Sequence, residues 1–152
     1  MIAVAYDRGA AALVARITGK VTDQDLGKFG RALLKLDMDS LGGKRVPVTI
    51  LAVTMGGDRP TAEQRRMMAD LWDPIQAPLH LFALVSRSPV ARGIFKVVQW
   101  LNPPRGRRRE IALPTFADAA LWVEQQRGEP MPSLTRLYEQ DTDNQTAGSA
   151  RP

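Results

Sequence analysis

The stretch that decides the fold is Val46 to Trp72, which reads VPVTILAVTMGGDRPTAEQRRMMADLW. Its apolar run from Val46 to Val53 shows no polar alternation, which is typical of a strand buried on both faces of a parallel sheet. The segment from Gly56 to Pro60 supplies turn chemistry. Thr61 and Gln64 match a capping box, which marks the start of a helix. The stretch therefore predicts a central strand, a loop at its carboxyl end and a crossover helix.

The same two patterns recur on both sides of this stretch. Strands are expected at Ile2 to Tyr6, Ala11 to Thr18, Leu79 to Val85 and Glu110 to Leu113. Further helices are expected at Thr22 to Leu36, Val90 to Leu101 and Phe116 to Gln126. The order ββαβαβαβα predicts an α/β fold with a single mixed, mostly parallel five-stranded sheet and about four helices. Only the first hairpin is expected to be antiparallel.

Apolar stripes on the helices are expected to face the sheet. For the helix from Val90 to Leu101, the stripe is Val90, Ile94, Val97, Val98 and Leu101. Phe95 and Trp100 stand beside it and either widen the core face or are exposed at a contact, and we expect the former. The methionine-rich stripe of the preceding helix is also expected to be core, although such stripes can form adaptable binding surfaces. Because four helices must cover five strands, one sheet face is expected to be less covered, which favours a homodimer.

Length and composition indicate one globular domain. The chain has 152 residues, of which 44% are apolar and 24% charged, and its net charge is +5. We expect an α/β domain over residues 1–127 and a largely disordered tail over residues 128–152, in which Ser133 to Tyr138 could form one more helical turn. The absence of cysteine fits a reducing cytosol, and it excludes disulfides, thiolate catalysis and cysteine-ligated metal sites.

The sequence carries no recognisable catalytic or cofactor motif. Neither Gly56-Gly57 nor Gly42-Gly43-Lys44 has the spacing or context of a phosphate-binding loop. His80, the single histidine, stands at the start of a strand, where we expect a structural role. The carboxylates Asp23, Asp25, Asp58 and Glu63 stand at helix starts, where capping explains them. We therefore expect no enzyme, no metal site and no cofactor.

A basic cluster follows the helix from Val90 to Leu101. It comprises Arg105, Arg107, Arg108 and Arg109. The plainest interpretation is a solvated loop. The alternative is a site for a lipid or another apolar or anionic ligand, because an apolar helix precedes a patch suited to head groups. Nucleic-acid binding is not expected, since few aromatic side chains stand nearby for base stacking.

The pattern resembles the SpoIIAA-like proteins, which are related to STAS domains and to the CRAL-TRIO fold. The resemblance covers Val4 to Gln126. It rests on the central strand with its loop and on three further motifs: Ile17-Thr18-Gly19-Lys20-Val21-Thr22, Trp100-Leu101, and Phe116-Ala117-Asp118-Ala119-Ala120-Leu121-Trp122-Val123. It implies a bacterial, cytoplasmic, regulatory module without catalytic activity that binds a protein partner.

The resemblance also places the partner contact in the loop and helix after the central strand. The residues concerned are Thr54, Met55, Gly56, Gly57, Asp58, Arg59 and Thr61. STAS domains commonly carry a regulatory Asp-Ser-Gly at this junction, and this chain has no Asp-Ser pair there. Thr54 and Thr61 are the nearby hydroxyls, and a helix N-cap is the simpler interpretation of Thr61.

Overall fold

A computed structural model describes residues 1–41, 48–55, 61–71, 80–101, 103–104 and 108–148, with side chains except at 39–41 and 141–148. The elements in chain order are β1 (Ile2–Asp7), β2 (Ala12–Ile17), α1 (Asp23–Leu41), β3 (Val48–Thr54), α2 (Ala62–Asp70), β4 (His80–Ser86), α3 (Pro89–Leu101), β5 (Arg109–Leu113), α4 (Phe116–Arg127) and α5 (Pro132–Gly148). The predicted order is confirmed as far as α4, and α5 is an additional helix.

One mixed sheet runs through the molecule in the strand order β1-β2-β3-β4-β5. β1 pairs with β2 in antiparallel fashion, and the other three pairings are parallel. β3 is the middle strand, with Leu51 beside Val14 of β2 and Ala83 of β4. All three of these residues are buried, as a central strand requires. The predicted fold class and the role of the 46–53 run are thus confirmed for the described part, which begins at Val48.

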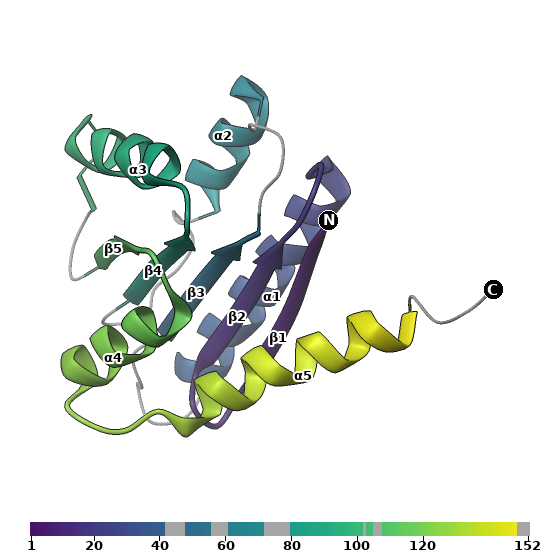
Figure 1. Cartoon of the computed structure of the whole chain (residues 1–152), viewed down its shortest axis with the longest axis vertical. Coiled ribbons are helices and arrows are strands. Elements are labelled where there is room, and N and C mark those ends of the chain that lie inside the picture. The colour runs from purple at the N-terminus through teal and green to yellow at the C-terminus, as the bar shows by residue number, and fades with distance from the viewer. Residues whose placement is uncertain (42–47, 56–60, 72–79, 102, 105–107, 149–152) are drawn as a thin grey trace.

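The helices form a layer on each side of the sheet (Figure 1). Each parallel strand pairs with the next one in the chain, so right-handed crossovers place α1, α2 and α3 on the same face. The core on that face is built around Leu26, Phe29 and Leu33 of α1, which pack against Leu13 and Ile50 of the sheet. Gly30 lets α1 approach the end of α2 closely, because an added Cβ would meet Leu71. Gly27 has no such contact beyond Arg31.

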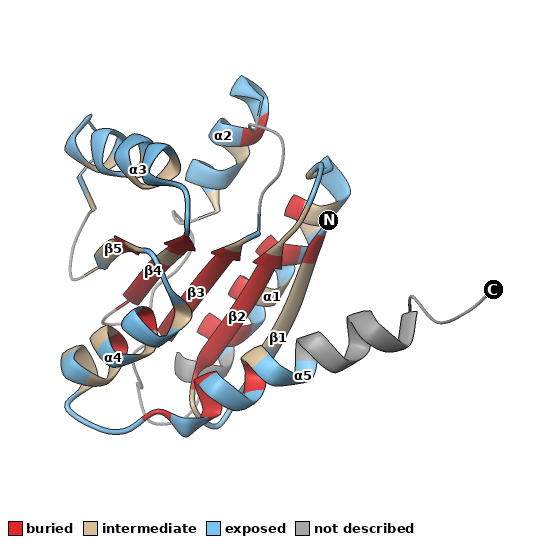
Figure 2. Ribbon diagram, viewed as in Figure 1, coloured by how far each residue is buried: buried red, intermediate tan, exposed pale blue. Residues whose placement is uncertain are grey.

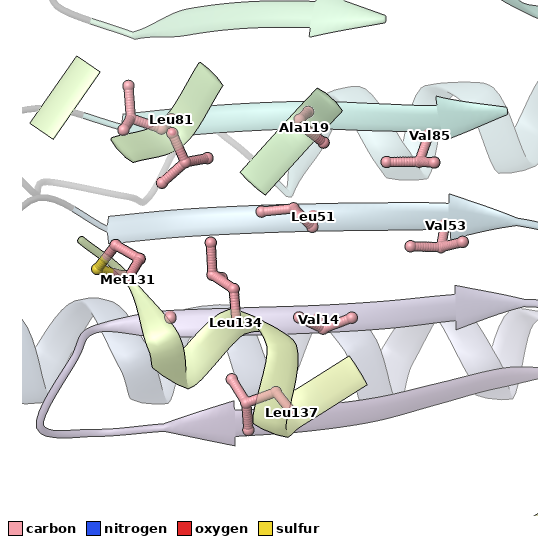
Figure 3. Packing of buried hydrophobic residues seen from close by; sticks show 12 residues of the cluster. Val14, Leu51, Val53, Leu81, Val85, Ala119, Met131, Leu134 and Leu137 are labelled. Carbon is pink, nitrogen blue, oxygen red and sulfur yellow. The ribbon is translucent and has the colours of Figure 1, made fainter. Parts of the chain in front are cut away.

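The opposite face is covered by α4 and α5, and Figure 3 shows the side chains that close it. Ala119 and Val123 of α4 are buried there together with Met131, Leu134 and Leu137. The prediction of a less covered sheet face is therefore wrong, and that ground for a homodimer no longer holds. The helical turn considered for Ser133 to Tyr138 lies within α5, which is longer than expected and extends to Gly148. Leu134 and Leu137, with Met131 just before the helix, recur every third position, so an amphipathic helix forms within a polar sequence.

Polar contacts hold α5 on the sheet. Tyr138 accepts a hydrogen bond at its backbone carbonyl from the Arg16 guanidinium. The central carbon of this guanidinium lies 4.1 Å from the centroid of the Tyr138 ring, and that ring stacks on Phe116. Arg136 forms an ion pair with Asp7 at 2.7 Å. Arg16 is buried within a strand, so these contacts supply part of the polar environment that a buried charge requires.

Candidate functional site: the outer face of α3

The apolar stripe of α3 is exposed, and Figure 2 shows this helix in the colours of exposed and intermediate residues along its whole length. No residue of this helix is buried. The outer face of α3 consists of Val90 (62% exposed), Ile94 (50%), Val97 (55%), Val98 (50%), Trp100 (81%) and Leu101 (70%). The prediction that this stripe packs against the sheet is wrong, and Trp100 does not widen the core.

The opposite side of α3 faces the sheet through one aromatic and two polar side chains. Phe95 packs on Phe82 of β4, with 5.8 Å between ring centroids. Arg92 donates a hydrogen bond of 2.6 Å from Nη1 to the carbonyl of Ser86. Gln99 approaches Glu110 of β5, with its Nε2 at 3.5 Å from Oε2. Because Arg92, Phe95 and Gln99 recur at helical spacing, they fix which side of the helix faces inward. Phe95 is therefore the one residue of the predicted aromatic pair that joins the core.

The start of α3 is tied to the carboxyl end of β4. Ser88 accepts a hydrogen bond of 3.2 Å at Oγ from the backbone N–H of Ala91, as an N-cap does. The backbone N–H of Ser88 donates to Oγ of Ser86 at 3.3 Å. Pro89 occupies the first helical position, where its missing N–H costs nothing. The cap fixes where the helix leaves the sheet, and thereby where its outer face lies.

The segment that contains α3 is strongly basic. From Arg87 to Arg109 the sequence has seven arginines and lysines and no aspartate or glutamate, whereas the net charge of the whole chain is +5. Arg87 and Lys96 are exposed beside the outer face of α3. An apolar surface with positive charge and no acidic residue in its own segment is suited to a partner that is apolar and negatively charged.

The predicted basic cluster is only partly visible. Arg105 and Arg107 lie outside the described residues. Nε of Arg108 lies 2.8 Å from a carboxylate oxygen of Glu110, and both side chains are largely buried. Arg109 is exposed and donates a hydrogen bond to Gln126 of α4. Arg108 is therefore engaged at the sheet edge, and Arg109 is the described member of the cluster that faces solvent.

The predicted partner loop after β3 is described only at its two ends, because Gly56, Gly57, Asp58 and Arg59 lie outside the described residues. Thr54 donates a hydrogen bond of 3.2 Å from Oγ1 to the carbonyl of Val85. Met55 is 60% exposed. Thr61 caps α2: Oγ1 accepts from the N–H of Gln64, and the Gln64 side chain accepts from the N–H of Thr61, both at 3.1 Å. The predicted capping box is confirmed, and both hydroxyls have structural partners.

Asp25 and His80, two further polar candidates, also occupy positions that the fold explains. Asp25 accepts hydrogen bonds from the backbone N–H and the hydroxyl of Thr22, at 3.0 and 2.9 Å. The backbone hydrogen bond from Thr22 is the main cause that lowers the pKa of the Asp25 carboxyl. His80 is buried at the first position of β4. Among the described residues, no group of three or more histidines, cysteines and carboxylates is placed to hold a metal ion.

Comparisons with protein-family models, with curated proteins and with solved structures found no significant match. Within the described residues, no helix has both the length and the apolar composition needed to cross a membrane. Among the residues that the structure describes, the outer face of α3 is the largest group of exposed apolar side chains along one element.

Proposed function

We propose that this protein is a non-catalytic regulatory module and that it contacts its partner through the outer face of α3. The observation that carries this proposal is the exposure of six large apolar side chains along one helix, each at least half exposed. Contiguous apolar surface of this kind is uncommon on soluble proteins, and it marks interaction sites. Isolated exposed residues elsewhere, such as Leu121 on α4, need no such explanation.

The packing of α3 supports a binding role over a structural one. The residues that attach the helix to the sheet lie on its other side, so the outer apolar residues add little to the stability of the fold. Replacing surface residues away from special features usually changes the free energy of unfolding by less than about 0.5 kcal/mol. A stripe that the fold does not need, yet that costs solubility, is better explained by contact with a partner.

The loop after β3 is the second candidate contact for a protein partner. Met55, at the carboxyl end of β3, is 60% exposed, and Met68 of α2 is also exposed. Loops at the carboxyl ends of parallel strands are frequent binding sites in α/β proteins. The resemblance of the sequence to SpoIIAA-like proteins favours a protein partner at this position. The chain lacks cysteine, which suits the reducing cytosol, and we infer that the module acts there.

A photo-crosslinking amino acid at position 97 tests the role of the outer face of α3. The matched control places the same amino acid at position 121, where Leu121 is 56% exposed on α4. In intact cells we expect crosslinked products from position 97 and few from position 121. Equal products from the two positions, or none from position 97, would contradict the proposed contact.

A further inference from the structure

We propose that the outer face of α3 docks onto an anionic lipid bilayer. This inference rests on the proposed role of that face, and it specifies what the face contacts. Three features of the described residues point to a bilayer: the direction of the apolar stripe, the charge of the segment and the position of Trp100.

The stripe suits a flat apolar surface. Val90, Ile94, Val97 and Leu101 recur at helical spacing over the whole of α3, whose 13 residues span about 20 Å. The side attached to the sheet, marked by Phe95, lies on the other side of the helix. Hence the helix can lie parallel to a membrane plane with its stripe buried at the boundary of head groups and acyl chains, while the domain remains in water.

The charge of the segment selects an anionic surface. Between Arg87 and Arg109 the sequence has no acidic residue, and the described cations that are exposed beside the outer face of α3 are Arg87 and Lys96. A bilayer with anionic lipids attracts such a segment, and each added basic residue near the surface strengthens binding roughly fivefold at low salt. A second copy of this chain would bring the same positive charge against itself, so self-association through this face is opposed by repulsion.

Trp100 has the position expected of an interfacial anchor. It is 81% exposed in the last turn of α3, one turn after Lys96 on the same side of the helix. Tryptophan prefers the head-group level of a membrane because its ring is apolar and its N–H is polar. A lysine beside it can extend its ammonium group to the lipid phosphates while its methylene stem covers apolar surface.

Vesicle flotation tests the inference. The full chain is mixed with vesicles of phosphatidylcholine alone, or of phosphatidylcholine with phosphatidylserine, at low and at high salt. We expect flotation with the anionic vesicles at low salt, and much less with neutral vesicles or at high salt. Absence of flotation with anionic vesicles at low salt, or equal flotation with neutral vesicles, would overturn the inference.

Three variants assign the contact to the outer face of α3. Ile94→Gln combined with Val97→Gln should weaken binding by about tenfold or more, because two apolar side chains lose their burial in the bilayer. Lys96→Glu should weaken binding at low salt and change it little at high salt. Leu121→Gln, which removes an exposed apolar residue from α4, should bind like the unaltered protein. Unchanged flotation of the double variant would overturn the inference.

The outcomes separate this inference from the proposed function. All the substituted residues are exposed, so circular dichroism should show folded variants. If flotation fails while position 97 still crosslinks to a protein, the bilayer is excluded and the outer face of α3 remains a contact surface. If position 97 yields no crosslinks to protein or lipid and flotation fails too, the proposed function falls together with the inference.

Discussion

The helices α3 and α5 contrast in how their apolar residues are used. α3 is rich in valine, isoleucine and leucine, yet none of its residues is buried. α5 is largely polar, yet Leu134 and Leu137 are almost fully buried on the sheet. The burial of a helical stripe is therefore decided by which sheet surface remains to be covered and by which side of the helix is anchored. The amount of apolar sequence alone does not decide it.

The largest expected effect is in α5. Leu134→Ala should lower the free energy of unfolding by about 2–5 kcal/mol, because Leu134 is fully buried and its removal leaves a cavity. Ile94→Ala in α3 should change it by less than about 0.5 kcal/mol, since that side chain is half exposed on the outer face. Urea denaturation measures both. Equal losses would mean that the stripe of α3 contributes as much to the stability of the fold as the buried residues of α5.

The next effect separates the two sides of α3. Phe95→Ala should cost about 2 kcal/mol, less than for a fully buried phenylalanine, because the ring is only partly buried against Phe82. Trp100→Ala should cost less than about 0.5 kcal/mol in spite of the larger ring, because Trp100 is 81% exposed. Thermal unfolding followed by circular dichroism ranks the two variants. A greater loss of stability for Trp100→Ala would mean that the side of α3 with Trp100, and not the side with Phe95, packs against the sheet.

Replacing two glycines by alanine should change the free energy of unfolding by smaller amounts and in opposite directions. Gly128 ends α4 with φ at 73° and directs the chain towards α5, so Gly128→Ala should cost about 1 kcal/mol. Gly93 lies within α3, and a Cβ added there would meet nothing within 4 Å. Gly93→Ala should therefore stabilise the protein by about 0.5–1 kcal/mol through helix propensity. Chemical denaturation should show opposite signs, and a loss at both positions would imply that α3 is packed on its outer side as well.

The smallest expected effect on stability lies outside α3 and α5, at Asp25 near the start of α1. Asp25 accepts hydrogen bonds from Thr22 at the start of α1, and its pKa is lowered in the folded state. Its contribution to stability is therefore present above the unfolded pKa of about 3.9 and is lost as the pH falls through the lower folded value. Asp25→Asn should be less stable than the unaltered protein near neutral pH, and the difference should shrink in acid. A constant difference across the acid range would contradict this assignment.

Much of the fold could be predicted from the sequence because the signals are local. The run from Val48 to Val53 is apolar without alternation, and the capping box of Thr61 and Gln64 identifies itself by spacing. The order of strands and helices followed from these signals. Only one turn of α5 could be expected from the sequence, because its apolar positions Leu134, Leu137 and Tyr138, with Met131 just before the helix, stand in a polar sequence. The sequential right-handed crossovers place α1, α2 and α3 on one face of the sheet, which leaves only α4 for the other face. This shortage of cover is the signal that could have indicated a further helix.

The candidate site was only partly predictable. Periodicity shows that the apolar residues of α3 share one side, but it does not show which side the sheet will meet. That choice depends on Phe95 and Arg92, whose partners Phe82 and Ser86 belong to β4. The signal that could have indicated an outward stripe is charge, because the segment from Arg87 to Arg109 has seven basic residues and no acidic one.

The contact between Arg16 and Tyr138 has a consequence for synthesis on the ribosome. The two residues are 122 positions apart, so β2 emerges long before the helix that covers it. Until α5 has left the exit tunnel, the apolar surface of β1 and β2 on that side stays open to water and to chaperones. Exposed strands at this stage are prone to aggregation. This side of the sheet is thus covered only after α5 has emerged, and a nascent chain arrested before Met131 should remain bound to chaperones.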